Sequence, residues 1–210
     1  MFADISSKKS IIRKAHVKAE LNDSAIPKIY VDTNILQGAI SRRDTDAIVF
    51  LDKAKEKGWE ISTSIHTLME LLDVAKDRQF LMRCVYERWT DVNTFMRKRG
   101  AKDLGGEDLS NLAKEVNNFF LTYKTIKFIN INDSDWNLVK KIGETSNLNS
   151  SDILHLVTAY VGGCRVLATH DGEFIKEGNK VLEQERVGNL LRVCDIIGME
   201  EKIKEICSSA

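Results

Sequence analysis

Four acidic residues lie beside segments that should be buried once the chain folds. They are Asp32, Glu70, Asp152 and Asp171. A carboxylate in apolar surroundings is costly unless it is paired, and two carboxylates about 4 Å apart repel by about 4 kcal/mol at an effective dielectric constant of about 20. A divalent cation held by oxygen ligands removes both costs. The four acids therefore suggest a metal-dependent hydrolase that acts on phosphates.

The order of the predicted strands and helices brings two of these acids to one edge of a sheet. Strands are expected at 28–31, 59–62, 126–131, 165–168 and 190–193, and helices at 44–57, 64–75, 134–145 and 151–161. Strands that alternate with helices predict an α/β fold with a central parallel sheet flanked by helices. Ligands of such folds bind at the carboxyl ends of the strands. Asp32 and Asp171 both fall at predicted strand ends.

The alternation of strands and helices stops in the middle of the chain. The segments 77–99 and 108–122 both have helical spacing of apolar residues, and a glycine-bearing loop at 100–106 separates them. Pro27 marks a boundary before the first strand. The predicted organisation is an N-terminal basic arm at 1–27 and one domain at 28–210, with a helical hairpin inserted at 76–124.

Asp32 is the acid with the clearest functional interpretation. It follows an apolar strand directly, and Asn34 could cap the helix that comes next, which leaves Asp32 without a structural role. Asn34 also breaks the Asp-x-Asp pattern of haloacid-dehalogenase-type phosphatases. An aspartyl-phosphate mechanism is therefore disfavoured.

The other three acids each have a structural explanation as well. Glu70 could face solvent on an amphipathic helix, where Asp73 competes with it. Asp152 could stabilise the dipole of the helix beside it by about 0.3–1 kcal/mol, and Asp171 could be a turn residue. His155, one turn beyond Asp152, could support the site or be a core histidine. The functional interpretation depends on all four acids occurring together.

Together the four segments resemble the four motifs of PIN-domain ribonucleases, many of which are VapC-type toxins. The segments are VDTNIL at 31–36, TLMELL at 67–72, SDILHL at 151–156 and ATHDGEF at 168–174. The resemblance implies that Asp32, Glu70, Asp152 and Asp171 form an acidic site for Mg²⁺ or Mn²⁺, with two ions expected. It also implies that Thr33, Asn34 and Thr169 support that site. The chain departs from the family at His170, where most members carry Asn.

The resemblance implies a metal-dependent endoribonuclease that hydrolyses RNA phosphodiester bonds. A toxin of a toxin–antitoxin pair is one form of this expectation, although this chain is longer than the small toxins. An antitoxin or another protein partner, and a homodimer, are compatible with it. Two alternatives remain open: a non-catalytic scaffold that binds RNA or protein, and a structure-specific DNase.

Any nucleic-acid site must be a local patch, because the formal net charge of the 210 residues is zero. The stretch Lys76–Lys102 holds eight Lys or Arg against three acids, with aromatic residues between them. Basic groups bind phosphates and aromatic rings stack on bases. Arg97, Lys98 and Arg99 are the predicted phosphate contacts, although the same residues could form a solvated surface.

The remaining sequence features predict a cytoplasmic protein. No apolar run approaches the ~18 residues of a membrane span, and the first residues lack the apolar core of a signal peptide. The four cysteines are far apart in the sequence, without a Cys-x-x-Cys pair. That spacing is typical of core thiols in a reducing compartment.

Overall fold

The computed structural model describes residues 26–86, 104, 106–188 and 190–208. Residues 1–25 of the predicted basic arm and the predicted phosphate contacts Arg97, Lys98 and Arg99 lie outside these residues. The described residues form two compact units. One lies within Met1–Ile65 and Thr125–Ala210, and the other lies within His66–Lys124.

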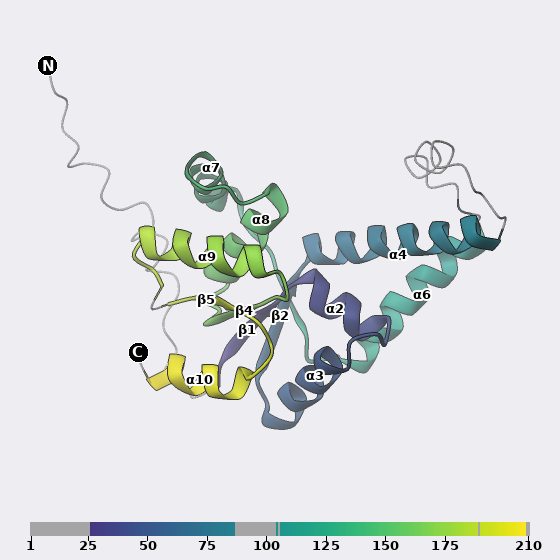
Figure 1. Ribbon diagram of the computed structural model, residues 1–210, viewed down its shortest axis with the longest axis horizontal. Coiled ribbons are helices and arrows are strands. Elements are labelled where there is room, and N and C mark those ends of the chain that lie inside the picture. Colours follow the sequence, from purple (N-terminus) through teal and green to yellow (C-terminus); the bar gives the residue numbers. More distant parts are fainter. Residues whose placement is uncertain (1–25, 87–103, 105, 189, 209–210) are drawn as a thin grey trace, which may run out of the picture. The chain divides into compact units, whose positions relative to one another are not determined.

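A five-stranded parallel sheet forms the centre of the first unit, with the strand order β3-β2-β1-β4-β5 (Figure 1). The strands are β1 (Lys28–Val31), β2 (Glu60–Ser64), β3 (Lys127–Ile129), β4 (Val166–Ala168) and β5 (Arg192–Cys194). Ile29 of β1 pairs with Ile61 on one side and with Val166 on the other. All three are buried, as expected for parallel strands covered on both faces. The predicted α/β fold with a central parallel sheet is confirmed.

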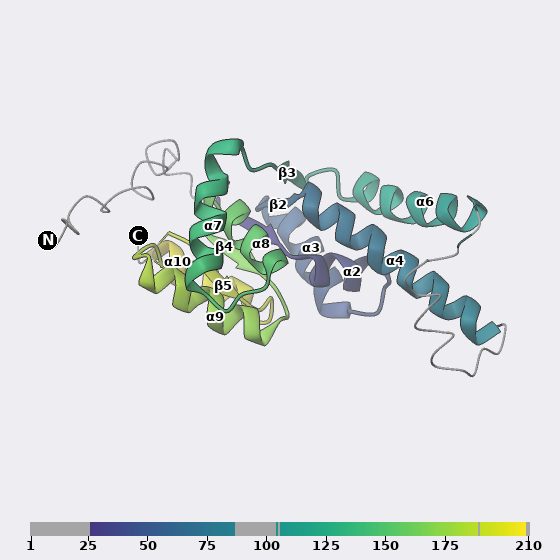
Figure 2. The same cartoon turned by 90° about the horizontal axis from the view of Figure 1, so that it is seen from above.

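Helices cover both faces of this sheet. The described helices of the first unit are α2 (Thr33–Ile40), α3 (Thr45–Lys57), α7 (Trp136–Thr145), α8 (Ser150–Val161), α9 (Gly172–Gln184) and α10 (Met199–Ser208), with a short 3₁₀ turn, η2 (Asp133–Asp135). Helices α8 and α9 lie on one face, and α3 and α10 lie on the other (Figures 1 and 2). One apolar core joins α7, α8, α9 and the sheet, with Leu156, Leu167 and Phe174 among its fully buried members.

The predicted helix at 44–57 shows why local sequence signals succeed here. Asp44 is the N-cap of α3, and its carboxylate accepts a hydrogen bond from the backbone N–H of Ala47 at 3.0 Å. Gly58 ends the helix with φ of 68°, a left-handed conformation that glycine adopts at little cost. By contrast, α9 and α10 were not predicted from the sequence.

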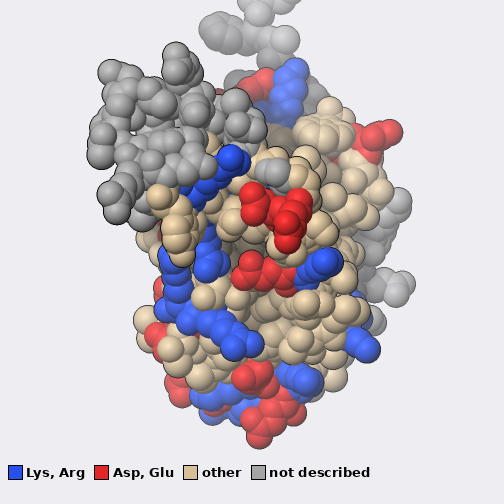
Figure 3. Space-filling view, turned by 90° about the vertical axis from the view of Figure 1, so that its right-hand side faces the viewer, with Lys and Arg blue, Asp and Glu red and all other residues tan. Residues whose placement is uncertain are grey.

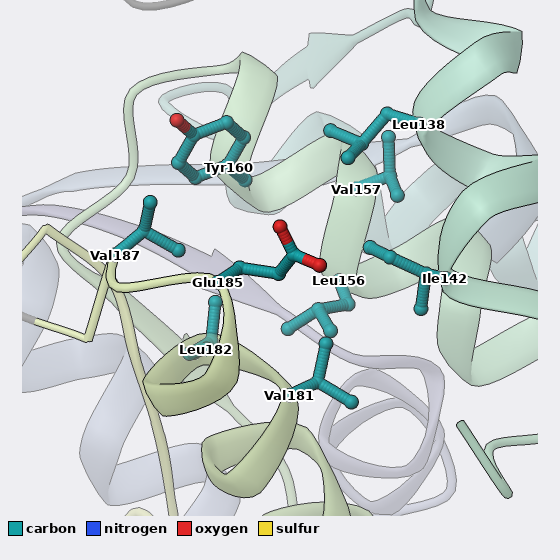
Figure 4. Close-up of a pocket in the computed structure, with 9 residues that line it drawn as sticks. All are labelled: Leu138, Ile142, Leu156, Val157, Tyr160, Val181, Leu182, Glu185 and Val187. Carbon is teal, nitrogen blue, oxygen red and sulfur yellow. The ribbon is translucent and has the colours of Figure 1, made fainter. Parts of the chain in front are cut away.

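A small pocket lies between α7, α8 and α9 (Figure 4). Its lining is mostly apolar, with Leu138, Ile142 and Leu156 among its side chains. Two polar groups, Glu185 and Tyr160, also line it, and Lys141 donates to Glu185 Oε2 at 2.6 Å. Burial and the nearby negative charge of Glu185 raise the pKa of Tyr160. The ion pair with Lys141 explains how the Glu185 carboxylate is tolerated beside this mostly apolar pocket.

The second unit contains α4 (Ile65–Tyr86, of which Ile65 belongs to the first unit) and α6 (Gly106–Thr122). Gln79 of α4 donates to Asp108 of α6 at 3.1 Å, and Leu112, Val116 and Phe119 form the buried side of α6. The loop of the predicted hairpin falls largely outside the described residues, so the hairpin boundaries stay a prediction. In the described part of the chain, no helix is long and apolar enough to cross a membrane.

Candidate functional site

Asp32 lies immediately after β1 and is the N-cap of α2. Its backbone N–H continues the sheet by donating to Ala168 O of β4 at 3.0 Å. The side chain of Asp32, and not that of Asn34, therefore caps the helix that follows. The expectation that Asn34 could cap this helix was wrong. Only 6% of Asp32 is exposed.

Three hydrogen bonds and a contact with His155 hold the Asp32 carboxylate in one orientation. Oδ1 accepts from the backbone N–H of Thr33 at 2.6 Å and lies 3.3 Å from His155 Nε2. Oδ2 accepts from Asn34 Nδ2 at 2.9 Å and from the Thr169 hydroxyl at 2.6 Å. A buried carboxylate with donors on both oxygens is rigid as well as stabilised, because any rotation breaks several bonds at once.

Thr169 connects Asp32 to Asp171. It is fully buried, and its hydroxyl oxygen accepts from the backbone N–H of Asp171 at 3.1 Å while its proton goes to Asp32. Asn34 strengthens this link, because its amide donates to Thr169 Oγ1 at 2.8 Å and its carbonyl oxygen accepts from His170 N at 3.2 Å. The predicted supporting residues Thr33, Asn34 and Thr169 thus all contact Asp32.

Asp171 is the N-cap of α9. Its Oδ1 accepts from the backbone N–H groups of Glu173 and Phe174 at 2.9 and 3.0 Å. The side chain is exposed, and its Oδ2 accepts no hydrogen bond from the described residues. Asp171 therefore combines a fixed orientation with an oxygen that faces no protein donor there.

Asp152 lies in the first turn of α8. Its backbone N–H donates to the N-cap Asn149, whose amide in turn donates to Asp152 Oδ2 at 2.7 Å. One turn further along the same helix, His155 approaches Asp32. Helix α8 therefore connects Asp152 to Asp32 through His155.

Glu70 belongs to the second compact unit. It lies on α4 and pairs with His66, one turn earlier, at 3.4 Å. The structure thus brings Asp32, Thr169 and Asp171 together within the first unit and links Asp152 to them through α8. The membership of Glu70 in the same site stays a prediction.

An Asp–His–Asp cluster borders the site, and two of its members were not predicted. His170 Nδ1 lies 2.9 Å from Asp195 Oδ2, and its Nε2 lies 2.8 Å from Asp44 Oδ2. Burial disfavours the His170 cation, but the bonds to Asp195 and Asp44 outweigh that effect, so the pKa of His170 is raised. Asp195 follows β5 as Asp32 follows β1, so the rule that selected Asp32 could also have selected Asp195.

The carboxylates of this cluster titrate in the opposite direction. The hydrogen bond from the backbone of Ala47, and then the bond and charge of His170, lower the pKa of Asp44. Burial raises the pKa of Asp195, but the backbone of Ile197 and the charge and bond of His170 outweigh it and lower the pKa overall. The cluster ties the start of α3 and the end of β5 to the loop that carries Asp171.

Positive and negative side chains are mixed on the face of the molecule in Figure 3. Two basic residues of the stretch Lys76–Lys102 contact acids, since Lys76 pairs with Asp73 at 3.7 Å and Arg78 with Glu115 at 3.8 Å. Arg42 and Arg43 are exposed and have no ion-pair partner among the described residues. Arg42 has a φ of 54°, uncommon for a residue with a side chain.

Comparison with protein families identifies the class of this protein. A family model of the PIN domain matches residues 29–179, which is well over half of the 210 residues. The chain therefore belongs to the PIN-domain family, whose members are generally metal-dependent nucleases. The comparison with curated proteins gave no match. The resemblance read from the four sequence motifs is confirmed at the level of the family.

The residues of the site fit a hard divalent cation. The ligands on offer are carboxylate oxygens, which Mg²⁺ and Mn²⁺ prefer. Among the described residues, neither Asp32 nor Asp171 forms an ion pair with Lys or Arg. No Lys or Arg side chain among the described residues therefore takes the place of a cation beside them.

Proposed function

We propose that this chain is a divalent-metal-dependent endoribonuclease. The observation that carries the proposal is the link through Thr169, whose hydroxyl contacts Asp32 Oδ2 and the backbone of Asp171. Two carboxylates are thereby fixed at the carboxyl ends of the neighbouring strands β1 and β4, the edge where parallel sheets bind ligands. The PIN-domain match supports nuclease chemistry at this edge.

The residues have separate roles in this proposal. Asp32, Asp152 and Asp171, together with Glu70, would hold two ions of Mg²⁺ or Mn²⁺. Such ions, when bound, activate water and stabilise the leaving oxygen of a phosphodiester. Asn34 and Thr169 keep the Asp32 carboxylate oriented, and the backbone of Thr33 fixes its Oδ1. Supporting groups of this kind are typically worth 10–100-fold in metal affinity or activity.

The motif resemblance to ribonucleases supports RNA as the substrate. We also propose that the chain acts as the toxin of a toxin–antitoxin pair, on the same resemblance to VapC-type proteins. Expression in a bacterial host should then slow growth, and Asp32→Asn should restore it. Growth arrest that persists in the Asp32→Asn variant would contradict the toxin role without bearing on cleavage in vitro.

Two rival functions make different predictions in one assay. The purified protein is incubated with equal amounts of labelled single-stranded RNA and DNA, with Mn²⁺ or with EDTA. We expect RNA to be cut in Mn²⁺ and both strands to stay intact in EDTA. Preferential cutting of DNA would favour the DNase, and intact RNA and DNA in Mn²⁺ would favour the non-catalytic scaffold.

A further inference from the structure

A buried chain of polar groups leads from the sheet to Asp32. The Tyr30 hydroxyl lies 2.8 Å from Ser64 Oγ and 2.9 Å from His155 Nδ1. The other ring nitrogen of His155, Nε2, lies 3.3 Å from Asp32 Oδ1. Tyr30 is fully buried, and Ser64 and His155 are 4% and 2% exposed. The chain Ser64–Tyr30–His155–Asp32 thus runs through the interior of the first unit.

The burial of these four polar groups needs an explanation, because polar groups in a core are costly unless each finds a partner. Aliphatic residues in place of Tyr30 and His155 would fill the same core without that requirement. The two rings also come from distant elements, β1 and α8, and are 125 positions apart in sequence. Their contact fixes α8 against the strand that ends at Asp32.

We infer that His155 is a positioning residue for Asp32 and that Tyr30 acts through His155. This inference rests on the proposed function, because Asp32 is the residue it serves. The Tyr30 hydroxyl donates its proton to Ser64 Oγ, so its oxygen is left to accept from Nδ1 of His155. Tyr30 thereby fixes the imidazole ring so that Nε2 faces Asp32 Oδ1 and donates to it.

The distances indicate which oxygen of Asp32 is served. Oδ2 has two short contacts, at 2.9 and 2.6 Å, whereas Oδ1 has one short contact and the 3.3 Å contact to His155. A long hydrogen bond aligns Oδ1 while withdrawing little of its electron density. Oδ1 is therefore the oxygen better able to accept a cation as well, and His155 sets its direction.

Three variants test the positioning role. Tyr30→Phe removes only the phenol oxygen, His155→Leu removes the donor to Asp32, and His155→Gln replaces the imidazole by an amide that can still donate. We expect His155→Leu to lower Mn²⁺ affinity and the kcat of RNA cleavage by about tenfold. Tyr30→Phe should cost less, and His155→Gln should recover part of the loss.

The double variant identifies the route of the effect. If Tyr30 acts through His155, Tyr30→Phe should cost activity in the wild-type background and nothing further in the His155→Leu background. Tyr160→Phe is the matched control, because it removes a phenol oxygen from a residue of α8 that lines the apolar pocket (Figure 4). It should leave Mn²⁺ affinity and kcat unchanged. Variants of Tyr30 and His155 that melt at lower temperature but keep wild-type Mn²⁺ affinity and kcat would overturn the inference.

An NMR measurement that does not depend on RNA cleavage separates this inference from the proposed function. The chain has four histidines, so the ring ¹⁵N signals of His155 can be assigned by comparison with His155→Gln. In the metal-free protein we expect a proton on Nε2 of His155, and a shift of that signal in Asp32→Asn. If the wild type neither binds Mn²⁺ nor cuts RNA, the proposed function fails and this signal alone decides. A His155 signal that does not respond to Asp32→Asn would overturn the inference in either case.

Discussion

The Thr169 hydroxyl donates to Asp32 Oδ2 at 2.6 Å across 137 positions of sequence, and both side chains are buried. This bond joins the end of β1 to the loop after β4. The hydroxyl oxygen of Thr169 also accepts from Asp171 N at 3.1 Å, so one hydroxyl sets the positions of two acids. Its loss should therefore be felt at both acids.

We expect Thr169→Val to lower the free energy of unfolding by about 1–3 kcal/mol, since it leaves buried polar groups without a partner. Mn²⁺ affinity should fall as well. Thr169→Ser keeps the hydroxyl and should retain most of both. Urea unfolding and Mn²⁺ titration of the two variants provide the measurement. Equal Mn²⁺ affinities in Thr169→Val and Thr169→Ser would show that this hydroxyl does not organise a metal site.

Asn179 completes the edge of the sheet. Its Oδ1 accepts from Val193 N at 3.0 Å, and its Nδ2 donates to Val193 O at 2.7 Å. One side chain of α9 therefore binds both the N–H and the C=O of Val193 in the edge strand β5. We expect Asn179→Leu to cost about 2 kcal/mol of unfolding free energy and to promote aggregation through the uncovered edge. Asn179→Gln, which keeps the amide but lengthens the side chain, is the comparison. Wild-type stability in Asn179→Leu would rule out this role.

The sequence predicted the parts of the site that depend on local order. Asp32 and Asp171 were found because they fall at strand ends, and the structure places both at the carboxyl edge of the sheet. Helix α9 was not predicted, although Phe174, Gly178 and Val181 recur with helical spacing and are buried. The apolar pattern starts only after the acid, and a turn was the structural alternative considered for Asp171.

The contacts between distant segments could not be predicted from one sequence. Asp44 appeared only as a helix start, and its bond to His170 joins residues 126 positions apart. The approach of His155 to Asp32 is of the same kind. Contacts of this kind produce no characteristic residue spacing in the sequence. They become visible only when the order of the strands in the sheet is known.

The His170 cluster should make stability depend on pH. Because the pKa of His170 is raised on folding, its contribution is fully present below the unfolded value, about 6.5, and is lost as the pH rises through the folded pKa. Asp44 and Asp195 have lowered pKa values, so their contribution is present above about 3.9 and is lost as the pH falls through their folded pKa values. The stabilisation should be largest at about pH 4–6.5.

Urea unfolding of the wild type and of His170→Asn at pH 5.5 and pH 8.5 measures this dependence. Asn cannot become charged, so the stability difference between the two proteins should be larger at pH 5.5 and should shrink at pH 8.5. A difference that is the same at both values would mean that the charge of His170 contributes nothing to folding.

Arg97, Lys98 and Arg99 remain the predicted phosphate contacts of the hairpin. Replacing all three by Ala should weaken RNA binding and reduce the slope of log affinity against log salt by about 0.7 for each lost contact. The comparison is Arg42→Ala with Arg43→Ala, which removes two exposed arginines of the described residues. If the triple variant keeps the wild-type affinity and salt slope, the hairpin does not bind the substrate. The acidic site would stand, because it depends on other residues.

Asp32→Asn is the most direct test of the acidic site. The substitution keeps the volume and one acceptor oxygen, so the Thr33 cap can persist. The new amide faces donors from Asn34 and Thr169, and we expect a loss of about 1–2 kcal/mol of unfolding free energy. Asp133→Asn is the matched control, since it makes the same change at an exposed acid of η2.

The deciding measurement is RNA cleavage in Mn²⁺ by the wild type, Asp32→Asn and Asp133→Asn, well below the melting temperature of each. We predict that Asp133→Asn cuts RNA at the wild-type rate and that Asp32→Asn, still folded by circular dichroism, does not cut it. Wild-type cleavage by folded Asp32→Asn would contradict the assignment of the site to Asp32 and its neighbours.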